Sequence, residues 1–157
     1  MATDLIQRLP ADHVEKALER LRATRGLLDL RLWASATSAA YYAALHAAHA
    51  LLATIGIAPA THAGTHQLLG QHFIRDGSLP ASLGRSFGHL MTDGETAVYG
   101  AARLIDEVGA REAAGTAAAI IRPVLRLVAE RDPGAAALVA EAMAELDRLP
   151  TIPPPGT

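Results

Sequence analysis

One segment, from Trp33 to Leu52, constrains the fold of this chain more than any other. It consists largely of alanine, the strongest helix former, which carries no side chain long enough to crowd a neighbouring helix. The segment therefore predicts one long helix that other helices approach closely. We place its start near Arg31 or Trp33 and its end at Ile55, with Gly56 terminating it.

The few large polar side chains of this segment fall on one stripe. Tyr42, His46 and His49 are separated by four and then three residues, so they lie on the same face of a helix. Tyr41 points about 100° away from Tyr42 around the helix axis, so the two rings cannot face one site. We expect one tyrosine to pack in the core with its hydroxyl paired, and the other to line a cleft or a dimer interface.

Turn and cap residues divide the rest of the chain into further helices. Pro10 is expected to start the first helix, which ends near Gly26, and Thr61 is the expected N-cap of the third. The third and later helices are expected, in chain order, at residues 61–75, 80–99, 110–131 and 135–149. Without any convincing strand alternation, these elements predict an all-α, antiparallel up-and-down bundle of about five to six helices.

This pattern also predicts the domain organisation. The expected parts are a flexible N-terminus (1–9), a helical bundle (10–131), an additional C-terminal helix (134–149) and a Pro-rich disordered tail (150–157). We find no internal repeat.

Composition excludes several classes of function. The chain of 157 residues has no cysteine, which excludes disulfides and thiol nucleophiles. Its formal net charge of -2 gives no basic footprint, so we expect no binding to duplex DNA. Without an apolar N-terminal run or a membrane span, we expect a cytoplasmic protein with no membrane partner.

Four elements, in the same order, resemble one known family. Tyr41-Tyr42-Ala-Ala-Leu-His46-Ala-Ala is similar to the second helix of the HEPN-domain proteins, in their small prokaryotic UPF0332-like branch. Residues 50–62 resemble the end of that helix and the family's next turn, residues 73–85 its next helix-loop-helix, and Tyr99-Gly100 its Ala-Asp-Tyr-Gly. The resemblance covers residues 11–130 and implies a HEPN-like bundle.

The resemblance also implies a site around His46. Active HEPN ribonucleases resemble one another in an Arg, a short spacer and then a His. In this branch the Arg usually directly precedes Ala-Tyr-Tyr, where this chain has Ala39. Near Tyr99, where relatives often carry another Arg, it has Gly94. The candidate catalytic residue is therefore His46, and the candidate cleft or ligand-binding residues are Tyr41, Tyr42, His49 and Tyr99.

His46 has two interpretations. A His titrates near neutral pH, so it can move protons to or from the 2′-hydroxyl or 5′-oxygen of RNA. That chemistry needs a cation for the scissile phosphate, and the candidates are Arg31, Arg85 and Arg103. In the other interpretation, His46 is a buried residue that is hydrogen-bonded to a tyrosine or to the backbone.

Two histidine pairs have spacings that suit metal ligands. His46-x-x-His49 and His62-x-x-x-His66 could hold one ion between two helices, but neither pair has a carboxylate at a matching spacing. Such pairs arise often by chance in a chain with seven histidines. We therefore expect no metal and no cofactor.

Two classes of function fit these observations. The first is a degenerate, non-enzymatic HEPN-like module that binds RNA, a nucleotide or a partner such as a nucleotidyltransferase antitoxin, in a toxin–antitoxin or defence context. The second is a metal-independent endoribonuclease toxin that uses His46. A plain helical dimer without a ligand site is a third, weaker interpretation. The resemblance also implies a homodimer, for which the alanine face at Ala39-Ala40, Ala43-Ala44 and Ala47 offers a surface of close approach.

Overall fold

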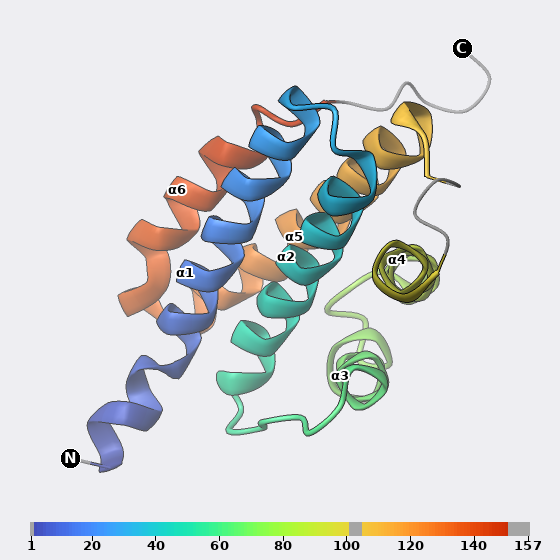
Figure 1. Ribbon diagram of the computed structural model, residues 1–157. Helices are drawn as coiled ribbons and strands as arrows, with labels where there is room; N and C mark the ends of the chain where they lie inside the picture. Colours follow the sequence, from blue (N-terminus) through green and yellow to red (C-terminus); the bar gives the residue numbers. More distant parts are fainter. Residues whose placement is uncertain (1, 101–104, 151–157) are drawn as a thin grey trace.

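The chain folds into packed helices (Figure 1). The computed structural model describes residues 2–100 and 105–150, with the backbone alone described for residues 2–8 and Tyr99. The helices are α1 (Ala2–Asp29), α2 (Trp33–Ala53), α3 (His62–Leu69), α4 (Ala81–Tyr99), α5 (Glu107–Arg131) and α6 (Ala136–Leu146), with a π-helical turn η1 (Gly70–Ile74) and a 3₁₀ turn η3 (Pro133–Ala135). The described residues contain no strand, which confirms the all-α prediction.

Four of the helices form the body of the bundle. In Figure 1, α1, α2, α5 and α6 lie lengthwise, with α1 and α6 running in one direction and α2 and α5 in the other. The helices α3 and α4 are seen end-on in the same view, so they cross the other four. Helix α2 contacts α1, α3, α4 and α5 and is therefore the centre of the fold.

The alanines of α2 explain this central position. Each of eight alanines of α2 is at most 4% exposed: Ala36, Ala39, Ala40, Ala43, Ala44, Ala47, Ala48 and Ala50. Small side chains let the neighbouring helices come close, and larger ones such as Leu21, Phe87 and Ile121 then fill the core between the helices. The expectation that the alanine face forms a dimer surface is wrong, because the chain's own helices cover that face.

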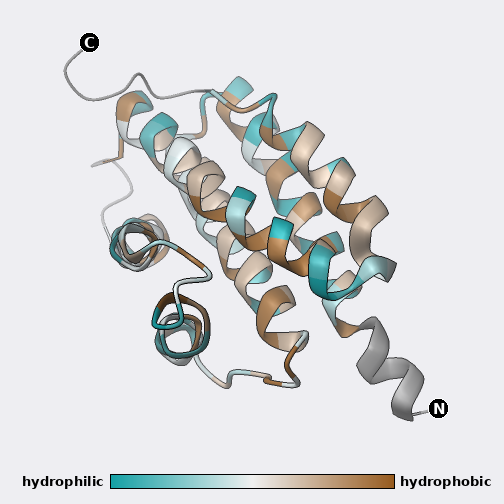
Figure 2. Ribbon diagram, turned by 180° about the vertical axis from the view of Figure 1, so that it is seen from behind, coloured by the Kyte–Doolittle hydropathy of each residue, from teal (hydrophilic) through white to brown (hydrophobic). Residues whose placement is uncertain are grey.

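The long helices around α2 are amphipathic. Figure 2 shows hydrophilic and hydrophobic residues along each of them, as expected of helices that pack one face inward and leave the other to solvent. None of the helices in the described part of the chain combines the length and the apolar composition that crossing a bilayer requires.

Several predicted helix ends are confirmed. The Thr61 hydroxyl accepts a hydrogen bond of 2.9 Å from the backbone N–H of Gly64, as an N-cap does. The helix expected from Pro80 or Ala81 begins at Ala81 and ends at Tyr99. Gly56 follows α2 with a φ of +77°, a left-handed conformation that glycine adopts without strain.

Other helix ends differ from the prediction. Helix α1 begins at Ala2, so Pro10 lies inside it and not at its start; a proline inside a helix removes one backbone donor without always ending the helix. Helix α5 begins at Glu107, before the expected Ala110, because the carboxylate of Asp106 caps it by accepting from the N–H of Gly109. The predicted tail lies outside the described residues, except for Pro150.

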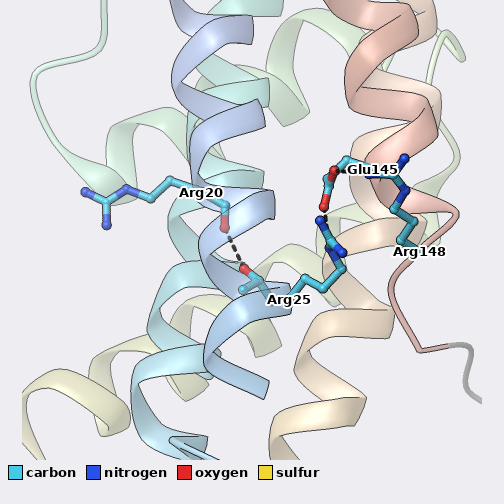
Figure 3. A network of polar contacts seen from close by, with 5 residues as sticks. Arg20, Arg25, Glu145 and Arg148 are labelled. Atoms are coloured by element: carbon cyan, nitrogen blue, oxygen red, sulfur yellow. Dashed lines mark hydrogen bonds and ion pairs between the residues drawn. The ribbon is translucent and has the colours of Figure 1, made fainter. Parts of the chain in front are cut away.

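A buried carboxylate joins the C-terminal helix to the bundle (Figure 3). Glu145 of α6 is only 3% exposed, and its Oε1 accepts a bond of 2.6 Å from Nε of Arg25 on α1. Its Oε2 accepts a bond of 3.3 Å from Nη1 of Arg148. A charge this deeply buried requires partners of this kind, so the ion pair fixes how α6 lies on α1.

Gly94 is required where α4 meets α2. A Cβ atom at this position would lie 2.7 Å from the Cγ and Cδ2 atoms of Tyr41, closer than carbon atoms pack. The backbone of α4 therefore rests directly on the Tyr41 ring. This contact leaves no room at Gly94 for the arginine that the family resemblance led us to look for.

We expect Gly94→Ala to destabilise the fold by about 1–3 kcal/mol, the usual effect of overpacking a core contact. Gly26→Ala is the matched control, because a Cβ atom at Gly26 of α1 meets nothing within 4 Å. Alanine there should raise the free energy of unfolding by up to about 1 kcal/mol. Urea unfolding of both variants measures the difference, and equal stability of the two would contradict the contact.

Candidate functional site

The polar stripe of α2 is partly open to solvent. Tyr42, His46 and His49 are each half-buried, and the residues between them are buried in the core. His49 contacts α3, where its Nε2 lies 3.0 Å from the hydroxyl of Thr65. The structure therefore places the three predicted residues on one face of α2, beside α3.

A second stripe, on α1, runs beside the first. His13, Lys16 and Arg20 follow one another at spacings of three and four residues on this helix. The guanidinium of Arg20 lies over the ring of Tyr42, 5.2 Å from its centroid. Figure 3 shows the Arg20 side chain extending away from Arg25, which binds Glu145. Among the described residues, neither Lys16 nor Arg20 forms an ion pair with a carboxylate.

Three histidines meet between the two stripes. The ring centroid of His13 lies 6.4 Å from that of His46 and 5.3 Å from that of His49, and the last two are 6.0 Å apart. The Nδ1 atoms of His13 and His46 are buried and have no hydrogen-bond partner among the described residues. The expectation that His46 is hydrogen-bonded to a tyrosine or to the backbone is therefore wrong for this buried nitrogen.

Burial keeps these imidazoles neutral. Together with smaller contributions from His49, His13, Arg20 and Lys16, it lowers the pKa of His46 from 6.5 to about 4. Burial is also the largest cause that lowers the pKa of His49 to about 4, and it lowers the pKa of His13. At neutral pH the three rings can accept a proton or bind through a lone pair, but they have no acidic proton to donate readily.

The two tyrosines have different roles. Tyr41 is 2% exposed and packs in the core, while Tyr42 is half-buried, which is the division that we expected. The hydroxyl of Tyr41 is nevertheless unpaired within the described structure, contrary to the expected pairing. Burial, with smaller contributions from Tyr42 and Glu95, raises the pKa of Tyr41 to about 12, so this hydroxyl keeps its proton. The exposed ring of His62 meets both tyrosines edge-on, with centroids 5.8 Å from each. The expectation that the two rings cannot face one site is therefore wrong at His62.

A hollow lies beside Ala39, which stands at the position of the family's arginine. Ala39 is 4% exposed and borders a hollow of about 350 Å³ that Ser35, Ser38 and Val98 also line. Arg20 lines the same hollow from α1. A cation from another helix thus lies near the place that Ala39 leaves empty.

Arg31 and Arg85, two of the three arginines suggested by the sequence, do not supply this cation. Arg31 stacks on Trp33, 5.5 Å from a ring centroid, and Trp33 lies about 20 Å along α2 from His46. Arg103 lies outside the described residues. After burial and the neighbouring histidines, the cations that lower the pKa of His46 are Arg20 and Lys16 and not Arg85. Sequence reasoning missed Arg20 and Lys16, because nothing in the local pattern of α1 relates these two residues to a histidine far along the chain.

The second predicted histidine pair does not join the first. His66 donates from Nε2 to the carbonyl of Gly84 at 2.8 Å and stacks on Phe87, with centroids 5.5 Å apart. It lines a separate hollow of about 360 Å³ with Gln67, Gln71 and Arg75 among others. His13 of α1 takes the place beside His46 and His49 that the sequence suggested for His62 and His66. The side chain of Tyr99, the remaining candidate, lies outside the described residues.

Comparison with known proteins gives one family. The family model for the HEPN domain matches residues 11–128. "Putative toxin MJ0605" of Methanocaldococcus jannaschii is 38% identical over 72 residues, which are 46% of this chain and 54% of that protein. "UPF0332 protein glr0978" of Gloeobacter violaceus is 35% identical over 74 residues, 47% of this chain and 59% of the relative. "UPF0332 protein PH1297" of Pyrococcus horikoshii is 32% identical over 81 residues, which are 52% of this chain and 57% of that protein. The chain thus matches only a little more than half the length of these relatives.

The lowered histidine pKa values predict a pH dependence of stability. Between the folded value of about 4 and the unfolded value of 6.5, the unfolded chain binds more protons at His46 and His49. The free energy of unfolding should therefore fall as the pH drops from 6.5 towards 4. In the double variant His46→Gln with His49→Gln, part of this loss should be absent. Urea unfolding at pH 7 and pH 5, in EDTA, measures it; the same loss in both proteins would contradict the burial of these rings.

Proposed function

Since the chain belongs to the HEPN-domain family, we propose that it is a toxin-related HEPN module that binds single-stranded RNA on the α1–α2 face and does not cleave it. We define this face by Lys16, Arg20, Tyr42, His49 and His62. The RNA ligand, the absence of cleavage and the toxin context are each part of the proposal.

The observation that carries the RNA proposal is the nearness of cations without a carboxylate partner to rings that are partly or fully exposed. Lys16 and Arg20 have no carboxylate partner in the described structure, so their charge is available to phosphates. The Tyr42 ring lies beneath Arg20, and the His62 ring meets Tyr42 edge-on, so both rings lie on the side of this cation. Proteins bind single-stranded nucleic acid through this combination of backbone charge and base stacking. The formal net charge of -2 does not oppose such a local surface.

The state of the histidines supports binding without cleavage. Cleavage of RNA requires a group that takes the proton of the 2′-hydroxyl and another that donates a proton to the leaving 5′-oxygen. With pKa values lowered to about 4, His46 and His49 are neutral near pH 7 and are poor proton donors. The arginine of the family's motif is also absent, since Ala39 stands in its place.

The second candidate function is a metal-independent endoribonuclease. Arg20 favours it, because this residue lines the hollow at Ala39 and its charge acts on His46. In this reaction neutral His46 would take the 2′-hydroxyl proton while the 2′-oxygen displaces the 5′-oxygen from phosphorus, and water would protonate the leaving 5′-oxygen. Arg20 would stabilise the charge on the phosphate.

The proposed context is a toxin–antitoxin pair. One relative of this chain carries the printed name "Putative toxin MJ0605", and this name supports a toxin role. A nucleotidyltransferase antitoxin as partner and a homodimer as the assembled form rest on the family resemblance alone. If a homodimer forms, its interface is not the buried alanine face of α2.

We expect Lys16→Ala with Arg20→Ala to weaken binding to a single-stranded RNA oligonucleotide and to make it less sensitive to salt. Removing two phosphate contacts should reduce the slope of log affinity against log salt concentration by about 1.4. Fluorescence anisotropy at several salt concentrations measures both effects. The matched control is Arg111→Ala with Arg126→Ala, which removes the same charge from the exposed surface of α5. Equal weakening by the two double variants would contradict a site on the α1–α2 face.

A cleavage assay separates the two candidate functions. We expect no RNA cleavage by the wild-type protein in EDTA, because the site lacks a proton donor and the motif arginine. Ala39→Arg tests whether the motif cation alone is missing, and the hollow at this position has room for the new side chain. Cleavage by the wild type that disappears in His46→Ala, with circular dichroism unchanged, would contradict the proposal and establish the ribonuclease.

A further inference from the structure

The three histidines of the site converge closely enough to bind one ion. His13 comes from α1, and His46 and His49 come from successive turns of α2. One nitrogen atom of each ring lies within 4.8 Å of the corresponding atoms of the other two. This is the one such group of three potential ligand residues found among the described residues, and it contains no carboxylate.

We infer that His13, His46 and His49 form a binding site for a divalent transition-metal ion, with Zn²⁺ as the reference ion. Three imidazoles are a donor set that suits Zn²⁺, Co²⁺, Ni²⁺ and Cu²⁺, whereas Mg²⁺ and Ca²⁺ prefer oxygen ligands. A tetrahedral Zn²⁺ with bonds of about 2.0–2.1 Å holds its ligand nitrogens roughly 3.4 Å apart. The rings therefore need only small side-chain rotations to reach it, and the fourth position is left for water.

The two unpaired nitrogen atoms support this assignment. Nδ1 of His13 and Nδ1 of His46 are both buried, and no group in the described structure forms a hydrogen bond with either. A buried polar atom without a partner destabilises a fold, and such atoms are rare in folded proteins. A metal ion bound through these two Nδ1 atoms would satisfy both at once. Because burial favours the neutral rings, no proton has to leave before a metal binds at neutral pH.

Thr65 orients the third ring. Its hydroxyl donates to the carbonyl of Thr61 at 3.0 Å, so the oxygen presents a lone pair to Nε2 of His49, which lies 3.0 Å away. Nε2 of His49 therefore carries the proton, and Nδ1 keeps the lone pair that a metal requires. A metal-binding histidine usually donates its other N–H to an oxygen in this way, which fixes the ring and its tautomer.

The charges around the cluster oppose a cation and give the proposal a further test. Lys16 lies near all three rings, Arg20 near His46, and Asp12 is the acidic group that acts on His13. Lys16 is exposed, so its removal should leave the packing unchanged while making the site less positive. We therefore expect Lys16→Gln to bind the metal more tightly than the wild type. The metal site shares His49 with the face proposed to bind RNA, but its ligands do not include Lys16 and Arg20, the cations that would hold phosphates.

Titration of the tag-free, EDTA-treated full chain tests the site. Co²⁺ reports tetrahedral coordination by its visible absorption, and calorimetry with Zn²⁺ gives the affinity and the number of ions bound. We expect one ion per chain and a large loss of affinity in each of His13→Ala, His46→Ala and His49→Ala. Thr65→Val removes the acceptor for His49 and keeps the shape of the side chain, and it should lower the metal affinity about tenfold or more. His89→Ala, an exposed histidine on α4, is the control and should bind as the wild type does.

The proposal does not depend on any one variant folding. Circular dichroism checks each protein, and Lys16→Gln alters only an exposed side chain. Wild-type binding no tighter than that of the folded His13→Ala protein would overturn the proposal. So would equal losses in His13→Ala and His89→Ala, because the ion would then be bound by scattered surface histidines.

Discussion

The close approach of helices to α2 is the constraint on which the rest of this structure depends. Eight buried alanines along this helix let α1, α4 and α5 pack against it. The contact is tight enough that α4 rests its backbone on a tyrosine ring at Gly94. An enlarged residue on either side of such a contact moves a helix, because protein interiors have little empty volume.

The same constraint decides where chemistry is placed. A helix that is nearly half alanine has few positions for large polar side chains, and those of α2 lie where α1 and α3 leave its surface partly open. His46 and His49 are therefore half-buried between two helices, where burial favours their neutral form and directs them towards His13. Lys16 and Arg20 stay at the outer edge of the same face. The neutral ring nitrogens inside are the physical basis for metal binding, and the cations outside are the physical basis for RNA binding.

Most of the fold was predictable because its signals are local. Alanine content predicted α2, and the cap at Thr61, the loop before Ala81 and the glycine at Gly56 marked helix ends that the structure confirms. The predicted start of α1 was wrong, because Pro10 suits the first turn of a helix but also fits inside one. The alanine face was misinterpreted for a related reason. A sequence shows that a face permits close approach, but not whether the approaching helix belongs to the same chain.

The site was only half predictable. The spacing of Tyr42, His46 and His49 placed them on one face, but the residues that complete the site come from α1. His13, Lys16 and Arg20 lie 22 or more residues before Tyr42, and only the antiparallel packing of α1 on α2 brings the two stripes together. Their own spacing of three and four residues was visible in the sequence. It resembled an ordinary solvated helix face, which no local rule distinguishes from one side of a site.

The central claim is that the face between α1 and α2 is the functional surface of this protein. The most direct test is to map backbone amide chemical shifts by NMR while a single-stranded RNA oligonucleotide is added to the full chain. We predict that the chemical-shift changes concentrate at residues 13–20, 42–49 and 62–65. Changes concentrated instead at the hollow beside Gln71 and Arg75, or along α5 and α6, would contradict it.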